Sequence, residues 1–255
     1  MATPLEVLQG FERRIADSAD LENPRLELLP PLTAGEVERL KSQIPCPIPE
    51  EAAELFRYAR GFKIRNPLLH GAHRELSKVD LSGLDAEFGL KQIFPHALSM
   101  ADDGCGNYWV VDLTNNSTSW GPIFYACHDA PVVVYQTESL AHFIEHVLKG
   151  GVDLTPNHNE LDAVHEELAT RIWRENPGAL DFEECSRSED PDLKAFAMSL
   201  DASYQFTDLR TAKLGDGFSW GRYGPWTVNK RFGGKRIFAY QKKTRRQKFK
   251  QLWKR

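Results

Sequence analysis

The most constraining feature of the sequence is a series of four short β-type runs within residues 96–136, with only a few residues between successive runs. Each run is rich in β-branched or aromatic side chains and is bounded by turn-forming residues, as strands are. The runs are HALSMA (96–101), NYWVVDL (107–113), PIFYAC (122–127) and PVVVYQ (131–136). Connections this short cannot contain the crossover helices that parallel neighbours need, so the runs predict an antiparallel sheet.

The second run alternates as a half-buried strand does, with Trp109 and Val111 on one face and Asp112 on the other. We therefore expect Asp112 to be exposed or paired to a partner. The residues before this run, ADDGCG (101–106), are typical of a tight turn, because aspartate and glycine favour turn conformations.

Helical patterns flank the β-type runs. Thr33 and Glu36 form a T-x-x-E capping box that predicts a helix start, and Pro49 begins a further helix that we expect to end near Gly61. After the last run, apolar residues at helical spacing predict a helix over residues 138–149. The combination predicts an α+β fold, in which helices pack against an antiparallel sheet of about six strands.

The C-terminal part of the chain follows a different pattern. Residues 153–157 are typical of a linker, and the region after them predicts helices. Two strand-like runs, around 217–228 and 235–242, flank NKRFGG (229–234) as a possible hairpin. We therefore divide the chain into an N-terminal helix with a proline-rich connector (1–34), a central domain (35–152) and a C-terminal extension (153–255).

The charge of the chain is unevenly distributed. The composition, 41% hydrophobic and 27% charged, is that of a globular protein, and the formal net charge is −4. Residues 230–255 contain 12 Lys or Arg and no acid, which leaves a balance of −16 in the remaining 229 residues. An acidic body joined to a basic segment bears on the choice of partner and not on the fold.

The location of the protein is constrained by what the sequence lacks. No apolar stretch approaches the length of a membrane span, and the start MATPLEVLQGFERR has no apolar signal-peptide core. The four cysteines have no C-x-x-C spacing, which argues against a zinc knuckle or a redox pair. We expect a cytoplasmic protein with reduced thiols.

Three groups of residues resemble chemical sites, and in each a structural role is favoured. From Asp103, the sixth position of a calcium loop is Tyr108 instead of glycine, which argues against an EF-hand. In CHD (127–129), the cysteine and histidine point to opposite faces of a strand and cannot act together. His142 and His146 have a metal-binding spacing but lie on the polar side of their helix, without an H-E-x-x-H motif. We therefore expect no enzyme, no cofactor and no metal site.

The basic segment offers a different function, which is contact with nucleic-acid phosphates or with an anionic membrane surface. The simpler interpretation is a solvated tail, or one folded back on the acidic body, because blocks of like charge are often disordered. The residues that would contact nucleic acid are Lys242, Lys243, Arg245, Arg246, Lys248, Lys250 and Trp253.

Several short motifs appear in a characteristic order. They are Ile48-Pro49 before a helix, ADDGCGN (101–107), Asp112 at a strand end, GPI (121–123), His128-Asp129, and the helix start at Ser139–Phe143. Over about residues 35–149, just under half of the chain, this order resembles the SUKH superfamily, specifically its Smi/Knr branch, named for a fungal cell-wall assembly regulator. One departure is Arg60-Gly61, where Asn-Gly is usual.

The resemblance implies a non-catalytic protein with helices packed on an antiparallel sheet. Many bacterial members look like immunity proteins that neutralise toxins, often nucleases, by direct binding, and fungal relatives act as interaction hubs. The acidic body suits a basic partner, because complementary charge raises association rates. We therefore predict a partner-binding surface of exposed polar and acidic residues, made of Asp102, Asp103, Asn107, Tyr108, Asp112, His128 and Asp129.

Overall fold

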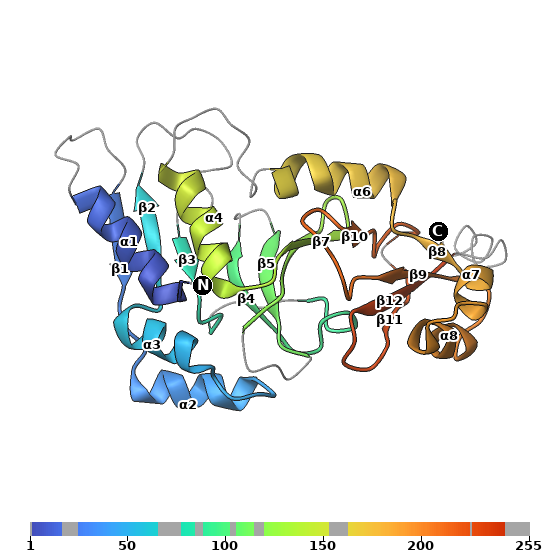
Figure 1. Ribbon diagram of the computed structural model, residues 1–255, viewed down its shortest axis with the longest axis horizontal. Helices are drawn as coiled ribbons and strands as arrows, with labels where there is room; N and C mark the ends of the chain where they lie inside the picture. The colour runs from blue at the N-terminus through green and yellow to red at the C-terminus, as the bar shows by residue number, and fades with distance from the viewer. Residues whose placement is uncertain are drawn as a thin grey trace, which may run out of the picture.

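The central element is an antiparallel sheet with eight strands among the described residues, in the order β1-β2-β3-β4-β5-β6-β7-β10. The structure is a computed structural model that describes residues 2–16, 25–65, 78–84, 89–102, 106–114, 120–152, 163–224 and 226–242. The strands are β1 (Arg25–Leu29), β2 (Gly61–Arg65), β3 (Lys78–Asp80), β4 (Ala97–Asp102), β5 (Tyr108–Asp112), β6 (Ile123–Cys127), β7 (Val132–Thr137) and β10 (Gly217–Phe218). From β1 to β10 they run from the left of Figure 1 toward its right.

The sheet confirms the predicted class and shows where additional strands come from. Strands β2 to β7 lie within residues 35–152, where about six strands are expected. The edge strand β1 precedes that range, and the opposite edge strand β10 comes from the C-terminal extension and pairs with β7. The chain therefore has an α+β fold whose main sheet is completed by residues from outside the central range.

Helices cover one face of this sheet. They are α1 (Pro4–Ala16), α2 (Ala34–Gln43), α3 (Glu50–Tyr58) and α4 (Leu140–Val152). The capping box at the start of α2 is present, because Thr33 Oγ1 accepts from the Glu36 amide and the Glu36 carboxylate accepts from the Thr33 amide. Helices α1 and α4 lie across the left half of the sheet in Figure 1.

Gly61 has a different role from the expected one. The helix α3 ends at Tyr58 with Ala59 as its C-cap, and Gly61 instead opens β2. A Cβ atom at position 61 would lie 2.0 Å from the carbonyl oxygen of Val79 on β3. Glycine is therefore needed here for the close approach of two strands and not for a helix end.

The C-terminal extension forms a second, smaller sheet with its own helices, at the right end of Figure 1. Its strand order is β11-β12-β9-β8. The second strand of the expected hairpin is present as β12, but its first strand is β11, which lies within NKRFGG, whereas Gly217–Phe218 of the expected run at 217–228 form β10 and pair with β7. The elements are the π-helical segment η2 (Ala163–Leu168), α6 (Ala169–Glu175), β8 (Leu180–Asp181), α7 (Phe182–Ser186), α8 (Pro191–Met198), β9 (Tyr204–Asp208), β11 (Asn229–Arg231) and β12 (Ile237–Gln241). The linker expected at 153–157 lies outside the described residues.

The side chains of β12 alternate between two apolar cores. Phe238 and Tyr240 face the main sheet, whereas Ile237 and Ala239 face α7 and α8. This period of two is the pattern of a strand buried on both sides. The second sheet is thus a middle layer that joins the main sheet to the last two helices.

The main sheet is also buried on both faces, which corrects the expectation of a half-buried strand at β5. Trp109 and Val111 pack under the helices, as predicted. Val110, on the opposite face, is fully buried in the core that includes Phe238 and Tyr240 of the second sheet. The alternation in the sequence shows which residues share a face, but it does not show that a later segment covers the second face.

The described helices include none that is both long enough and apolar enough to cross a bilayer.

Candidate partner-binding surface

Five of the residues expected to bind a partner meet at one end of the main sheet. Strand β4 ends at Asp102, which is paired across the strands with Tyr108 at the start of β5. Strand β6 runs antiparallel to β5 and ends beside it, so the turn that follows lies at the same end. We call this surface the strand-end edge, and its residues are Asp102, Asn107, Tyr108, His128 and Asp129.

The exposed members of the strand-end edge are two carboxylates and an imidazole. Asp102 is exposed, and the side chains of His128 and Asp129 are 56% and 75% exposed. Tyr108 is half-buried, because one side of it packs against the core between the two sheets. The edge therefore presents negative charge beside an aromatic ring.

Asn107 corrects the expectation that every member is exposed. Its side chain is buried, and its Oδ1 accepts a hydrogen bond of 2.9 Å from the backbone amide of His128. The side-chain amide of Asn107 thus fixes the start of the turn between β6 and β7. Asn107 positions the surface and does not present its own side chain to a partner.

His128 is held in one orientation by its neighbours. Gly106 has a φ of +91°, and a Cβ atom there would lie 3.1 Å from the His128 ring, so the imidazole lies directly over this glycine. The Nε2 atom lies 3.3 Å from a carboxylate oxygen of Asp129. A side chain larger than hydrogen at position 106 would displace the ring.

Asp112 lies at the other end of β5 and is not exposed. Its carboxylate accepts two hydrogen bonds from Arg231 of β11, at 3.0 Å (Oδ1) and 2.8 Å (Oδ2), and the two side chains are 1% and 3% exposed. The expectation of an exposed Asp112 is wrong because the second sheet covers this face and supplies the arginine.

The Arg231 guanidinium uses all five of its donors. Beside the two bonds to Asp112, Nε donates to the carbonyl of Lys235 (2.9 Å), Nη1 to that of Ile93 (3.1 Å), and Nη2 to that of Gly234 (3.1 Å). Two phenylalanine rings flank it, with centroids 5.3 Å (Phe238) and 5.9 Å (Phe94) from its central carbon. Full pairing is what allows a charge to be buried here. The sequence carries one signal of this pair, an aspartate that ends an otherwise apolar run.

The remaining predicted residues are divided between described and undescribed parts of the chain. Lys242, from the basic segment, is described and donates to the Asp181 carboxylate at 2.7 Å. Asp103 lies outside the described residues, as do the other residues expected to contact nucleic acid, which are Lys243, Arg245, Arg246, Lys248, Lys250 and Trp253. Nucleic-acid binding stays a prediction.

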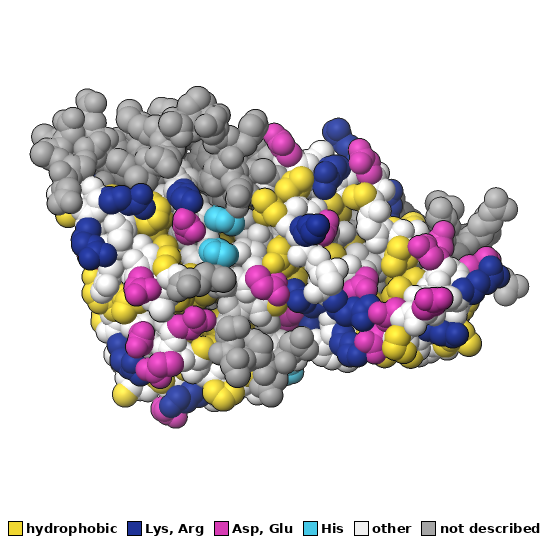
Figure 2. All heavy atoms as spheres, viewed as in Figure 1, with side chains coloured by type: hydrophobic (Ala, Val, Ile, Leu, Met, Phe, Trp, Pro, Cys, Tyr) yellow, Lys and Arg dark blue, Asp and Glu magenta, His cyan; other side chains and the backbone are white. Residues whose placement is uncertain are grey.

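The first half of the basic segment is folded and paired with acids of the body. Residues 230–242 form most of β11 and β12, and Arg236 contacts Glu138 at 3.1 Å. Figure 2 shows acidic and basic side chains interleaved around α7 and α8. Of the two structural alternatives for residues 230–242, the structure therefore agrees with the one folded back on the acidic body and not with the solvated tail.

The cysteines and histidines that resemble chemical sites have structural surroundings. Cys127 is buried in the core under the helices, and burial raises the pKa of Cys185 to about 11, so this thiol stays protonated at neutral pH. His146 lies beside Gln136, with Nδ1 3.2 Å from the amide nitrogen, and His142 is exposed. Within the ranges that the structure describes, no three His, Cys, Asp or Glu side chains are grouped as metal ligands would be.

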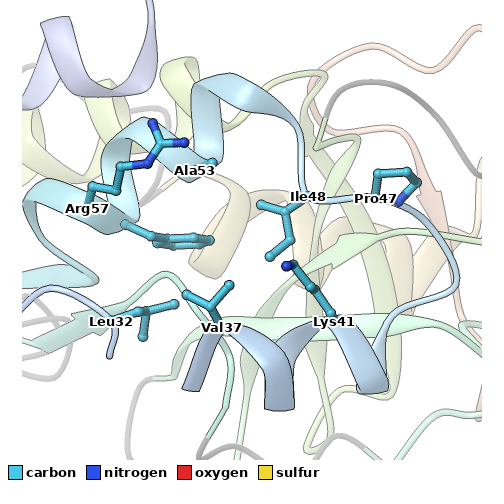
Figure 3. A pocket seen from close by; sticks show the side chains of 8 residues that line it. Leu32, Val37, Lys41, Pro47, Ile48, Ala53 and Arg57 are labelled. Atoms are coloured by element: carbon cyan, nitrogen blue, oxygen red, sulfur yellow. The ribbon is translucent and has the colours of Figure 1, made fainter. Parts of the chain in front are cut away.

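A groove of about 400 Å³ lies between α2 and α3 (Figure 3). Its walls are mainly apolar, and the lining residues are Leu32, Val37, Lys41, Pro47, Ile48, Ala53, Phe56 and Arg57. Lys41 and Arg57 are each paired with a glutamate of their own helix, at 2.7 Å and 3.0 Å. The lining therefore contains no acid–base pair that could carry a reaction.

Comparison with known proteins identifies one part of the chain. Residues 31–146 match the model of the SMI1 / KNR4 family (SUKH-1), a span just under half of the chain. No curated protein and no solved structure matches the chain. The matched residues contain α2, α3, strands β2 to β7 and the strand-end edge, and they end within α4. Residues 31–146 are thus similar to the SMI1 / KNR4 family (SUKH-1), in agreement with the resemblance that the order of their motifs indicates.

Proposed function

We propose that this protein is a non-catalytic binding module of the immunity type, which neutralises a basic toxin domain, such as a nuclease, by direct contact in the cytoplasm. The match of residues 31–146 to the model of a family that includes immunity proteins supports this function. The three described cysteines Cys46, Cys127 and Cys185 are free thiols, which accords with a reducing compartment.

The observation that carries the proposal is the convergence of Asp102, at the end of β4, and of His128 and Asp129, after the end of β6, on one exposed surface. Loops held by a rigid sheet are where binding residues gather, because the scaffold fixes their positions. Here Asn107 holds the turn, because its Oδ1 accepts a hydrogen bond from the His128 amide, and Gly106 leaves room for the His128 ring to lie over it.

The charge of the strand-end edge determines the kind of partner. Two exposed carboxylates attract a positively charged surface over about 10 Å at moderate ionic strength and so raise the association rate. Nuclease domains bind polyanions, so they present such surfaces, and a binder placed over that surface would also block substrate. An acidic surface that binds a basic nuclease domain would therefore both speed association and block the nuclease's substrate.

The test is binding to a panel of purified, catalytically inactive nuclease toxin domains that carry a net positive charge. We expect at least one to bind, with an association rate that falls as salt rises. The double variant Asp102→Lys/Asp129→Lys should weaken that binding at least about 10-fold, because it places like charges against the partner.

A matched control separates local from global charge. Glu175→Lys/Glu189→Lys makes the same change in net charge at two exposed glutamates of the extension, and it should leave the affinity within about 2-fold. Equal losses in the two double variants would show a dependence on net charge alone and would contradict the strand-end edge as the site.

A further inference from the structure

The loop that follows β10 emerges at the same end of the main sheet as the strand-end edge. Strand β10 pairs antiparallel with β7, with Phe218 opposite Val133, so the next residues continue toward the turn that precedes β7. The Gly221 amide donates to the carbonyl of Pro131 at 3.2 Å, and Pro131 is two residues from Asp129. A segment of the extension thus borders the predicted surface.

Contact between this loop and the turn requires glycine. A Cβ atom at Gly221 would lie 2.6 Å from the Cβ and Cγ atoms of Pro131, and a proline ring cannot move aside as a flexible side chain can. Ser219 adds a hydrogen bond of 3.3 Å from its hydroxyl to the same Pro131 carbonyl. The loop is therefore in direct contact with Pro131 of the turn that carries His128 and Asp129 of the strand-end edge.

The loop is fixed on its other side as well. The Arg222 guanidinium donates to the carbonyls of Trp173 and Arg174 near the end of α6, at 2.7 Å and 3.2 Å. The Ser219 amide donates to the buried Oδ1 of Asn176 at 3.0 Å. Such a loop needs little further ordering when a partner binds, which lowers the entropy lost on association.

Aromatic side chains dominate this loop, and one of them faces solvent. Trp220 and Tyr223 are partly buried against the core between the sheets, and the Tyr223 hydroxyl donates to Gln205 at 2.6 Å. Trp226 is 77% exposed, the largest fraction among the exposed large hydrophobic residues that the structure describes. Residues Trp220, Tyr223 and Trp226 are called the aromatic loop below.

An indole held in water on a fixed loop has the properties of an interface anchor. Tryptophan and tyrosine are enriched at the few interface positions that carry most of the binding energy, and such positions are surrounded by polar residues. His128 and Asp129 lie in the turn whose Pro131 this loop contacts, and they provide polar and acidic neighbours on the adjoining surface.

We propose that the aromatic loop and the strand-end edge form one composite surface, which binds a protein that has a basic face with an apolar pocket for the Trp226 indole. This inference rests on the proposed function and extends it, because half of the surface then comes from residues outside the family match. The two exposed carboxylates favour a partner whose surface is positively charged, and the indole requires an apolar pocket on that surface.

The experiment measures dissociation constants of full-length variants for the member of the toxin panel that binds the unaltered protein. Trp226→Ala should weaken binding about 30-fold or more, as truncation of a central aromatic anchor does. Met198→Ala removes another exposed apolar side chain, 66% exposed at the end of α8, and should change the affinity less than 2-fold. Both variants should keep the thermal unfolding midpoint, because neither side chain is buried.

A spectroscopic measurement follows the indole directly. With 5-fluorotryptophan incorporated, the ¹⁹F resonance of Trp226 is the one that disappears in Trp226→Phe. It should shift when the binding toxin domain is added, and a resonance that stays unchanged in the complex would contradict contact with the indole.

The outcomes distinguish this inference from the function on which it rests. If Asp102→Lys/Asp129→Lys abolishes binding and Trp226→Ala does not weaken it, the acidic surface stands and the composite surface is wrong. If Trp226→Ala alone weakens binding, the strand-end edge is not part of the interface and the composite surface is again wrong. If no member of the panel binds, both proposals fail.

Discussion

Arg231 and Asp112 lie 119 residues apart in the chain and form an ion pair in the interior, where the guanidinium donates to both carboxylate oxygens at 3.0 Å and 2.8 Å. Asp112 ends β5 within the residues that match the family model, and Arg231 ends β11 of the extension. The contact therefore joins the matched part of the chain to the part outside the match.

Removal of one partner of this pair should destabilise the protein strongly. Asp112→Leu or Arg231→Met leaves an uncompensated charge in the interior, and the expected loss is about 3–5 kcal/mol in the free energy of unfolding. The double variant Asp112→Leu/Arg231→Met should lose much less than the sum of the two, because no charge is then left buried. Urea denaturation followed by circular dichroism measures each value.

An exposed pair provides the control for that experiment. Lys41→Met breaks the contact with Glu38 at 2.7 Å on the surface of α2 and should cost less than about 1 kcal/mol. If the free energy lost in Asp112→Leu/Arg231→Met equals the sum of the losses in the two single variants, Asp112 and Arg231 do not act as a pair.

The junction between β7 and β10 is predicted to depend on Gly217. A Cβ atom there would lie 2.0 Å from the carbonyl oxygen of Val133, so Gly217→Ala should force β10 away from β7. Hydrogen exchange in the peptide that contains residues 132–137 should become faster, and the free energy of unfolding should fall by on the order of 1–3 kcal/mol.

Gly35 is the matched control, since no atom lies within 4 Å of its ideal Cβ position on α2. Gly35→Ala should stabilise the helix by about 0.5–1 kcal/mol, because alanine loses less conformational entropy than glycine. Unchanged exchange in residues 132–137 of Gly217→Ala would contradict the role of this junction.

The local elements follow from the sequence because their signals are local. The Thr33–Glu36 capping box and the alternation around Trp109 require only neighbouring residues, and both predict the observed elements. Gly61 shows the limit, because a glycine after a helix has the same local signature whether it ends that helix or permits a close strand contact. The decisive atom is the Val79 carbonyl on another strand.

The predicted site shows the same limit at longer range. Antiparallel pairing of short runs brings Asp102, Tyr108 and His128 to one end of the sheet, as hairpin connections require. Asp112 could not be placed from the sequence, because its burial depends on Arg231, which lies in a segment whose composition resembles a solvated tail. The local signal, an aspartate at the end of an apolar run, does not show which distant residue neutralises its charge.

Cys185 is predicted to be unreactive in the folded protein. The side chain is fully buried between α7, α8 and the second sheet, and burial raises the pKa of its thiol to about 11. N-ethylmaleimide at pH 8 should therefore modify Cys185 only after denaturation, as measured by peptide mass mapping. Rapid modification of Cys185 in the native protein would show that the last two helices do not cover it.

The same thiol makes a contribution to stability that depends on pH. A folded-state pKa above the unfolded value of about 8.5 stabilises the protein below pH 8.5, and this contribution is lost as the pH rises toward 11. Cys185→Ala removes the titrating group, so its free energy of unfolding should fall less steeply over that interval than that of the unaltered protein.

The ion pair between Asp181 and Lys242 makes a prediction at acid pH. The hydrogen bond and the charge of Lys242 lower the pKa of the Asp181 carboxyl below its unfolded value of about 3.9. A lowered folded-state pKa stabilises the protein above pH 3.9, and this contribution is lost as the pH falls through the folded-state value. Asp181→Asn should therefore be less stable than the unaltered protein at pH 6, and the difference should shrink as the pH falls below about 3.9.

Lys242→Gln tests the same pair from the other side. It removes the partner that lowers the Asp181 pKa, so its pH dependence between 3 and 6 should match that of Asp181→Asn in urea denaturation. A Lys242→Gln variant that retains the acid dependence of the unaltered protein would show that this lysine is free in solution. It would then be available for the nucleic-acid contact that the basic segment predicts, whereas matching profiles place Lys242 in the folded second sheet.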